Sequence, residues 1–395
     1  MREWKKLTLL SKKNLITTAL LVFACHLGID IYTPSLPNMV KIFNSTENTL
    51  QMAITSYLLG SGLSIIFWGP LSDRFGRKPI IMMGACIVTV SATATIFCQS
   101  IHLFLLLRFI QGTGSGAAMC LGRVVAADML NKHELAVIGA TIGLITGLAP
   151  MIAPVVGGYM ETYAGWQGSF AVYALLTSLA LSLFFFSFTE TLSEKTTHKH
   201  IIPLYKNLVS STPFILLAMM QGMLLSILNC YAAVAPFLVQ VEMHKSPVYF
   251  GLLSGFCAGC QLFTKMLFPL LIRKNHAYKI QRLGWHLLII GSLILFSRII
   301  LPFDIVFIIG IGFSFFSIHL IFPYVFSEAY TLKHARIGTI SAGLTAMGIL
   351  ISFLLSTIVA IIPYEGTGLL AATYFCLGIT GLIVSKKVHI LLDTH

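Results

Sequence analysis

The sequence has few charged residues. Only 10% of its 395 residues are Asp, Glu, Lys or Arg, whereas 56% are hydrophobic and the mean hydropathy is +0.87. In an average soluble protein about a quarter of the residues are charged. The shortage of charge therefore excludes an ordinary soluble protein and places the chain in the membrane class.

Acidic residues are especially scarce, with 14 against 26 basic residues and a net charge of +12. Such a surplus can indicate a nucleic-acid-binding surface, so the positions of the basic residues decide its meaning. Most of them fall on loops on one side of the predicted membrane spans. The exceptions are Lys41, Lys245 and Arg298 on the other side, and Arg108, Arg123 and Lys265 within spans. Because basic loops remain in the cytosol, we expect both termini there and no nucleic-acid partner.

Cysteines are few and poorly placed for a disulfide or a metal site. All eight lie in or at the ends of hydrophobic stretches, and Cys257 and Cys260 lack a second pair at metal-ligand spacing. We therefore expect no disulfide framework, no zinc site and no cofactor. A secretion signal is also not expected, because the first apolar run ends in Asp30-Ile31-Tyr32-Thr33-Pro34 without a small-residue cleavage site.

Long apolar runs, by contrast, are abundant. About 20 apolar residues suffice for a helix to cross the hydrocarbon core, and the sequence has twelve such runs. They are 14–34, 49–70, 79–98, 103–126, 135–160, 167–188, 212–240, 249–272, 282–300, 304–326, 335–361 and 367–386.

The polar segment 189–211 divides these twelve runs into six and six. We therefore predict an all-α integral membrane protein with an N-terminal six-helix half at 1–188, a cytosolic linker at 189–211 and a C-terminal six-helix half at 212–395. Two similar halves are typical of transporters in which the substrate binds near the middle of the membrane, between the halves.

Asp30 is the only acidic residue placed well inside a predicted span. A charge in the membrane interior is costly, so an ionisable residue there is a functional candidate by default. Arg108 is predicted at nearly the same depth, and the two side chains are expected to meet, directly or through polar groups. Burial and a nearby guanidinium act on a carboxyl group in opposite directions, which suits a reversible proton site. The alternative is a permanent structural ion pair.

Other polar residues within spans are weaker candidates. His26 precedes Asp30 by one helical turn and lies on the same face of the helix. One interpretation is that it donates a hydrogen bond to the carboxylate or relays protons to it. The other is that it is an ordinary packing histidine. Lys265 is expected to reach the cytosolic surface and is given no role in transport. Candidate substrate contacts, each also compatible with ordinary helix packing, are Tyr57, Gln221, Asn229, Tyr231 and His319.

One short segment between two apolar runs is densely charged. It reads Gly-Pro-Leu-Ser-Asp-Arg-Phe-Gly-Arg-Lys-Pro from residue 69 to residue 79, and its second glycine permits a sharp reversal of the chain. An acidic residue at the cytosolic end of the fourth span lies on the correct side to pair with these cations. The cluster can then act as a latch on one conformation, although any cytosolic loop collects basic residues. The candidate latch residues are Gly69, Asp73, Arg74, Gly76, Arg77, Lys78 and Asp128.

Small residues and prolines follow one another in the predicted fifth span. Glycines recur every four residues there and allow close approach of another helix, and the two prolines bend or loosen the helix. The segment is either a tightly packed helix or a hinge along the interface between the halves. Its residues are Gly139, Gly143, Gly147, Pro150, Pro154, Gly157 and Gly158.

Four segments together resemble the major facilitator superfamily. Residues 69–78 resemble its general motif between the second and third helices, and residues 107–112 (Leu-Arg-Phe-Ile-Gln-Gly) resemble its fourth-helix motif, whose arginine is linked to proton coupling. Residues 147–158 resemble the fifth-helix motif of its antiporters. Residues 28–37 resemble the first helix of the bicyclomycin-resistance (Bcr/CflA) subgroup of drug:proton antiporters.

The resemblance implies a carrier and not an enzyme. Such a carrier would export small amphipathic drug-like compounds across the bacterial inner membrane in exchange for protons, by alternating access, as in multidrug efflux and antibiotic resistance. Asp30 would be the protonation site, Arg108 its tuning partner and residues 147–158 the interface that prevents leak. The implied partners are a small-molecule substrate, protons and the lipid bilayer, with the chain acting as a monomer.

The sequence departs from some of these relatives in one respect. They carry a second acidic residue deeper in the first helix, whereas residues 20–27 here contain none. One proton per substrate is therefore predicted, with a preference for neutral or weakly charged compounds over dications. Two alternatives stay open, because the fold does not determine the cargo: a carrier of the same family for a specific metabolite or siderophore, in either direction, and a non-transporting membrane receptor.

Overall fold

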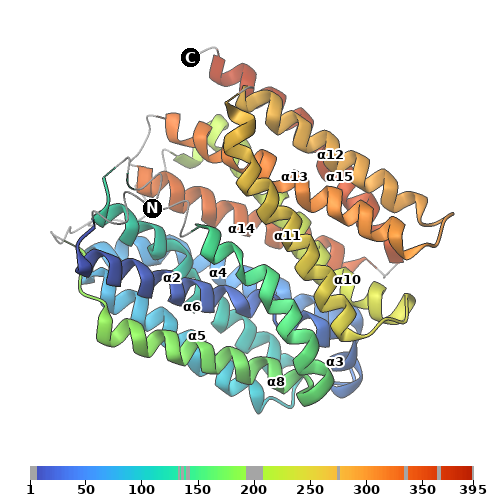
Figure 1. Cartoon of the computed structure of the whole chain (residues 1–395), viewed down its shortest axis with the longest axis horizontal. Helices are drawn as coiled ribbons and strands as arrows, with labels where there is room; N and C mark the ends of the chain where they lie inside the picture. Colours follow the sequence, from blue (N-terminus) through green and yellow to red (C-terminus); the bar gives the residue numbers. More distant parts are fainter. Residues whose placement is uncertain are drawn as a thin grey trace.

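All regular secondary structure that the computed structural model describes is helical (Figure 1). The structure describes residues 7–131, 134, 138, 143–192, 208–273, 276–332, 337–362 and 366–393. The elements are α2 (Leu9–Asp30), η1 (Thr33–Ser35), α3 (Leu36–Ile42), α4 (Glu47–Phe75), α5 (Arg77–Ile96), α6 (Ile101–Met129), α8 (Ala149–Ser187), α10 (Thr212–Phe237), η2 (Leu238–Glu242), α11 (Pro247–Ile272), α12 (Ala277–Ser297), α13 (Asp304–Thr331), α14 (Ile337–Ile361) and α15 (Gly366–Asp393).

The described residues contain 11 helical runs that are long and apolar enough to cross a membrane, and α8 explains the difference from the twelve predicted spans. A straight helix of its 39 residues would be roughly 60 Å long, about twice the thickness of the hydrocarbon core. Gly165 interrupts α8 with φ 67° and ψ −176°, a left-handed conformation that favours glycine. The ribbon folds back near the α8 label in Figure 1. The two arms of α8 are the fifth and sixth predicted spans, and the predicted fold class is confirmed.

The helices pack as two groups, which we call the first group (α2–α8) and the second group (α10–α15). In the first group α6 packs against both α4 and α5, and α8 packs against α2 and α5. In the second group α12 packs against α13 and α15, and α10 packs against α14 and α15. The groups meet along two seams, α8 against α11 and α4 against α14.

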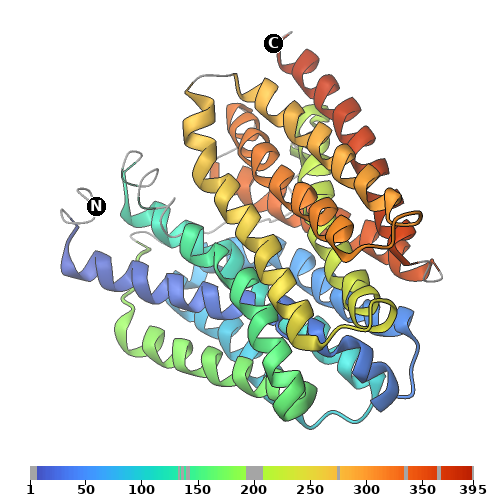
Figure 2. The ribbon, with the colours of Figure 1, turned by 45° about the vertical axis from the view of Figure 1, so that its right-hand side comes forward.

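The two groups converge at one end of the bundle and diverge toward the other (Figures 1 and 2). At the convergent end, which we call the far end, Gln240 Nε2 donates to the Pro34 carbonyl at 2.8 Å and Asn48 Nδ2 donates to the Ala360 carbonyl at 2.7 Å. The opposite end carries the turn at Gly76, and we call it the turn end. The bonds across the far end hold the two groups together there.

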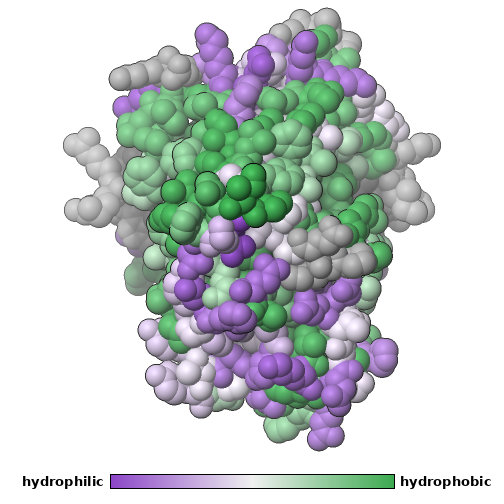
Figure 3. Space-filling model, turned by 90° about the vertical axis from the view of Figure 1, so that its right-hand side faces the viewer, coloured by the Kyte–Doolittle hydropathy of each residue, from purple (hydrophilic) through white to green (hydrophobic). Residues whose placement is uncertain are grey.

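The outer surface is rich in apolar side chains. Phe186 is 81% exposed and Ile300 is 82% exposed. On the face shown in Figure 3, hydrophobic residues form a broad area in the upper half, with hydrophilic residues at the top edge and over much of the lower half. Such exposure is unfavourable in water and normal in contact with lipid.

Two glycines bring α4 and α6 into backbone contact. A Cβ atom at Gly112 would collide with the Tyr57 carbonyl, and one at Gly60 would collide with the Phe109 carbonyl. These contacts require residues without side chains, as in the closely packed helix pairs of other membrane proteins. They fix the relative position of the two helices that carry Tyr57 and Arg108.

This packing can be tested with two matched alanine variants. Gly112→Ala should lower the free energy of unfolding by about 1–3 kcal/mol, the usual cost of overpacking a core. Gly259→Ala, on α11, is the control, because a Cβ there meets nothing within 4 Å; it should be neutral or slightly stabilising, since alanine favours helices by about 1 kcal/mol over glycine. Thermal unfolding in detergent, followed by tryptophan fluorescence, measures both. Equal midpoints for the two variants would contradict the packing argument.

Candidate functional site

Arg108 is fully buried in α6, with 0% of its surface exposed. Its Nη1 donates to the Gly28 carbonyl of α2 at 2.9 Å and to Gln111 Oε1 at 2.6 Å. Its guanidinium carbon lies 4.3 Å from the ring centre of Tyr32 and 4.6 Å from that of Tyr57. One arginine thus links α2, α4 and α6, and two aromatic rings stabilise its charge through cation–π contacts.

The hydrogen-bonding capacity of this site is not fully used. Within the described part of the chain, Arg108 Nε and Nη2 and the hydroxyl groups of Tyr32 and Tyr57 are buried without a partner at good hydrogen-bond geometry. The Tyr32 hydroxyl lies close to Arg108 and the Tyr57 hydroxyl lies close to Ser115. A buried donor without a partner costs about 1–3 kcal/mol, and more when it is charged. The free donors of Arg108 can therefore bind an oxygen atom without breaking an existing bond.

Asp30 is the last residue of α2 and is half-buried. No described residue forms a hydrogen bond with its carboxylate or an ion pair within 4.0 Å. It interacts with Arg108 only electrostatically, at longer range. The expected direct contact is therefore absent, and a permanent ion pair is wrong for this conformation. The physical reason is that Arg108 Nη1 bonds instead to the Gly28 carbonyl and to Gln111 Oε1.

His26 lies one turn before Asp30, as the helical spacing requires. Its Nδ1 donates to the Val22 carbonyl on the same helix at 2.8 Å, and no described bond joins it to Asp30. The imidazole is half-buried. This geometry corresponds to the packing alternative.

The charged turn is built around Gly76. This single residue separates α4 from α5 and has φ 110°. Arg77 is 6% exposed; its Nε donates to Asp128 at 2.9 Å and its Nη1 donates to Asp73 and Ser72, both at 2.5 Å. The side-chain bonds of Arg77 join α4, α5 and α6, which all belong to the first group.

The remaining candidate latch residues contribute less to this cluster. The Arg74 guanidinium lies 5.2 Å from the Phe75 ring and the Lys78 ammonium lies 5.7 Å from the Phe185 ring. A Cβ at Gly69 would meet nothing within 4 Å, so packing does not require a glycine there.

Glu190 completes the turn and was missed from the sequence, because it lies in the predicted linker. Its carboxylate accepts the backbone N–H groups of Arg77 at 2.9 Å and Lys78 at 3.1 Å, and those of Thr191 and Leu192, both at 3.0 Å. Partial burial alone would raise the pKa of Glu190, but these four donors outweigh it and the pKa lies below its usual 4.5. The carboxylate caps the N-terminus of α5, where a negative charge is favourable. Residues 193–207 of the predicted linker lie outside the described residues.

The glycine and proline segment faces α11 across the seam between the groups. A Cβ at Gly147 would lie 2.8 Å from Leu262 Cδ2, and one at Gly158 would lie 2.6 Å from the Pro247 carbonyl oxygen. A Cβ at Gly157 would collide with the Ile31 carbonyl. Pro150 lies in the first turn of α8, Pro154 lies inside the helix, and Gly139 lies outside the described residues.

Lys265 differs from its expected position. Its Nζ donates to the Gly143 carbonyl at 2.7 Å and is not directed to the membrane surface. The expectation was wrong because a carbonyl from another helix lies within reach, and only the tertiary structure places it there. A cation from the second group thus bonds to the first group at the seam.

Two of the five candidate substrate contacts form hydrogen bonds with neighbouring side chains, and three have a buried polar atom without a hydrogen bond to any described residue. Asn229 Nδ2 donates to Ser352 Oγ at 3.0 Å, and Tyr231 shares a 3.0 Å hydrogen bond with Ser254, so both are used in helix packing. Gln221 Oε1, the Tyr57 hydroxyl and His319 Nδ1 are buried without a partner in the described residues. These three have buried polar atoms that a ligand could bind.

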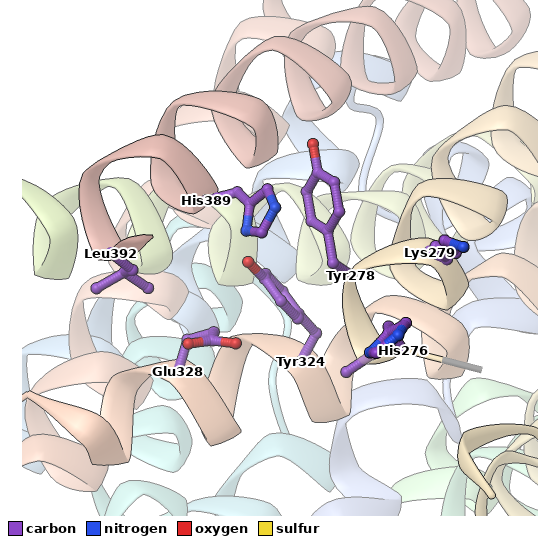
Figure 4. Close-up of a pocket in the computed structure, with 8 residues that line it drawn as sticks. His276, Tyr278, Lys279, Tyr324, Glu328, His389 and Leu392 are labelled. Carbon is purple, nitrogen blue, oxygen red and sulfur yellow. The ribbon is translucent and has the colours of Figure 1, made fainter. Parts of the chain in front are cut away.

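A separate cavity of 370 Å³ lies between α12, α13 and α15 (Figure 4). The rings of Tyr278 and His389 are stacked with their centres 3.7 Å apart, and Tyr324 and Glu328 lie nearby. Its lining contains none of the candidate site residues.

Comparison with known proteins decides the family. The family model described as "Major Facilitator Superfamily" matches residues 18–351. The chain belongs to the major facilitator superfamily. It is therefore a multi-pass membrane carrier of small molecules and not an enzyme.

Several relatives within the superfamily are drug-resistance proteins. The chain is 33% identical over 196 residues to the bicyclomycin resistance protein homolog of Haemophilus influenzae, covering 50% of this chain and only 48% of that protein. It is 26% identical over 334 residues to the multidrug resistance protein MdtM of Escherichia coli K12, covering 82% of this chain and 80% of that one. The solved D-xylose-proton symporter is 17% identical, covers 95% of this chain and 96% of its own, and superposes with a TM-score of 0.79, which shows the shared fold.

The Glu190 cap at the N-terminus of α5 predicts that the stability of the protein depends on pH. Because the pKa of Glu190 is lowered, its stabilisation is present above about pH 4.5 and is lost as the pH falls through the lowered value. Glu190→Gln should cost about 1 kcal/mol of unfolding free energy at pH 7, a typical value for a helix cap. The difference from the unmodified protein should shrink below pH 4.5. Lys78→Gln is the matched control, since it retains the backbone N–H group; a difference for Glu190→Gln that is constant with pH would contradict the cap.

Proposed function

We propose that this carrier is a proton-coupled antiporter that exports small amphipathic drug-like compounds across a bacterial inner membrane. The first and second groups would be its two domains, at residues 1–188 and 212–395, joined by a cytosolic linker at 189–211. The turn end and both termini would face the cytosol, and the carrier would act as a monomer. The observation that carries the proposal is the half-buried Asp30 carboxylate, which has no hydrogen-bond or ion-pair partner in the described residues, near a buried arginine with two unused donors.

The arrangement supports reversible protonation of Asp30. Partial burial opposes the negative charge and Arg108 favours it, so small movements change the balance. With the proton bound, Arg108 keeps its bond to the Gly28 carbonyl. After the proton leaves, the free Nε and Nη2 groups of Arg108 can bind the carboxylate. This new ion pair would change the relative position of α2 and α6.

A proton supplies enough free energy for such a pump. At a driving force of ~180 mV one proton delivers about 4 kcal/mol, scaling from ~2.3 kcal/mol per 100 mV. This supports a concentration gradient of about a thousandfold at ~1.4 kcal/mol per factor of ten. One acidic residue at the site is therefore sufficient.

The names of the relatives support export of toxic compounds as the physiological task. The Haemophilus influenzae relative is named for bicyclomycin resistance and the Escherichia coli one for multidrug resistance. The seam between α8 and α11 would open and close during transport, with Pro150 and Pro154 allowing α8 to bend.

Replacing Asp30 tests the proton site directly. In Asp30→Asn, substrate-dependent proton movement should fall to background, because the amide neither binds nor releases a proton in this pH range. Substrate binding and thermal stability should remain near those of the unmodified protein. The measurement is proton flux in proteoliposomes during exchange against a panel of toxic compounds. Unchanged coupled transport in Asp30→Asn would exclude this residue as the proton site.

Gly147→Leu tests movement at the seam. The added side chain must displace the Leu262 side chain, whose Cδ2 would lie 2.8 Å from the new Cβ, and it then occupies space between α8 and α11. The transport rate should therefore fall at least about tenfold, the factor that corresponds to ~1.4 kcal/mol. Gly259→Ala, whose Cβ meets nothing within 4 Å, is the control and should transport normally. Normal transport by Gly147→Leu would mean that the close approach of α8 and α11 is not needed during the cycle.

The same assays separate the alternatives. Growth in the presence of toxic compounds, compared with growth on single metabolites or with limited iron, distinguishes drug export from carriage of a specific metabolite or siderophore. A non-transporting receptor would move no solute in liposomes under an imposed pH gradient.

A further inference from the structure

Three basic side chains from both groups lie near one another between the groups. They are Arg123 on α6 of the first group, and Lys265 on α11 and His319 on α13 of the second group. Lys265 interacts electrostatically with both of the others. Arg123 is exposed, and Lys265 and His319 are half-buried. The positive charge is carried by Arg123 and Lys265, and His319 is counted as neutral. We call these three residues the cationic cluster.

Arg123 reaches across to the second group. Its guanidinium carbon lies 5.5 Å from the ring centre of Phe326 on α13, and its Nη1 donates to Thr345 Oγ1 of α14 at 3.5 Å. The second of these contacts is long for a hydrogen bond. The guanidinium is thus held in place by weak contacts, and most of its donors remain available.

No described carboxylate neutralises the cationic cluster. The ion pairs of the described residues do not include Arg123, Lys265 or His319. His319 Nδ1 is buried without a hydrogen-bond partner among those residues. The like charges of Arg123 and Lys265 in a partly buried region repel one another unless an anion balances them, and the described residues supply no such anion here.

An aromatic wall adjoins the cluster. The rings of His319 and Phe322 are stacked at 5.6 Å, and those of Phe322 and Phe326 lie 4.8 Å apart. These residues follow one another at three- and four-residue spacing along one face of α13. Positive charge beside a flat apolar surface is complementary to a molecule with an anionic group and an aromatic body.

We infer that the transported compounds include amphipathic organic monoanions, whose acidic group binds Arg123 and Lys265 and whose apolar body packs against Phe322 and Phe326. This inference rests on the proposed export function and names its substrate class. It replaces the expected preference for neutral compounds with a preference for anions over matched neutral molecules. Dications are excluded because the positive charges of Arg123 and Lys265 would repel them.

Transport of an anion also changes the charge moved in each cycle. One proton moving inward and one anion moving outward together transfer two positive charges inward, whereas exchange of a proton for a neutral molecule transfers one. The membrane potential therefore drives anion export more strongly than export of a neutral compound.

The experiment uses 2-naphthoate and 2-naphthamide, which share one ring system and differ in charge. Their binding to the full-length protein in detergent is measured by calorimetry at low and high salt. The naphthoate should bind at least about tenfold more tightly than the amide, and added salt should weaken only the naphthoate. Equal affinities, or tighter binding of the amide, would overturn the inference.

Variants locate the site. Arg123→Gln and Lys265→Gln should each weaken naphthoate binding by about tenfold and leave naphthamide binding unchanged, as expected for loss of one partner of a charge pair. Two variants from different helices are used because one of them can fail to fold. Arg282→Gln, an exposed position on α12, is the matched control and should bind like the unmodified protein. If Arg123→Gln and Lys265→Gln also bind naphthoate like the control, the site is wrong.

Proteoliposomes separate this inference from the proposed antiport. Proton-coupled exchange of the amide without any exchange of the naphthoate would leave the antiport intact and overturn the anion inference. Binding of the naphthoate that depends on Arg123, without any coupled proton movement, would support the anion site and contradict the antiport.

Discussion

The structure of the first group depends on how the buried guanidinium of Arg108 is held. A carbonyl group, an amide oxygen and two aromatic rings surround it, and no carboxylate of the described residues pairs with it. These neutral partners stabilise the charge at short range. They also leave Asp30 without a fixed partner in the described part of the chain. The same arrangement thus satisfies the arginine in part and keeps the neighbouring acid free to change its protonation state.

Glycines make the close packing around Arg108 possible. A Cβ at Gly28 would collide with the Tyr173 ring, whose hydroxyl donates to the Cys25 carbonyl at 3.2 Å. Gly60 and Gly112 bring α4 and α6 close enough for Tyr57 to lie against the guanidinium. In a membrane, where apolar side chains gain little by leaving lipid, such close packing supplies much of the association between helices. The position of the functional arginine is therefore set largely by glycines.

The sequence predicted features that depend on local chemistry. The number and length of the spans follow from apolar runs, and the reversal at Gly76 follows from its left-handed backbone. The pairing of Arg77 with Asp128 follows from their common side of the membrane. By contrast, the contact of Lys265 with Gly143 and the cap formed by Glu190 depend on groups 122 and 113 residues away in the chain. Sequence periodicity carries no signal for such pairs, and likewise could not show that Asn229 and Tyr231 bond to neighbouring helices.

The distance between the two charged regions limits how a proton and an anion can be coupled. Arg108 and Arg123 lie on the same helix, α6, 15 positions apart in the sequence, which corresponds to roughly 22 Å along a helix axis. At that separation two unit charges interact by only about 0.8 kcal/mol at an effective dielectric constant of ~20, so an anion at the cationic cluster has a small direct electrostatic effect on Asp30. The two ligands then do not compete for one site. In the proposed exchange, the coupling would instead run through the movement of the two groups about the seams at α8–α11 and α4–α14, which both ligands would bias from opposite ends of α6.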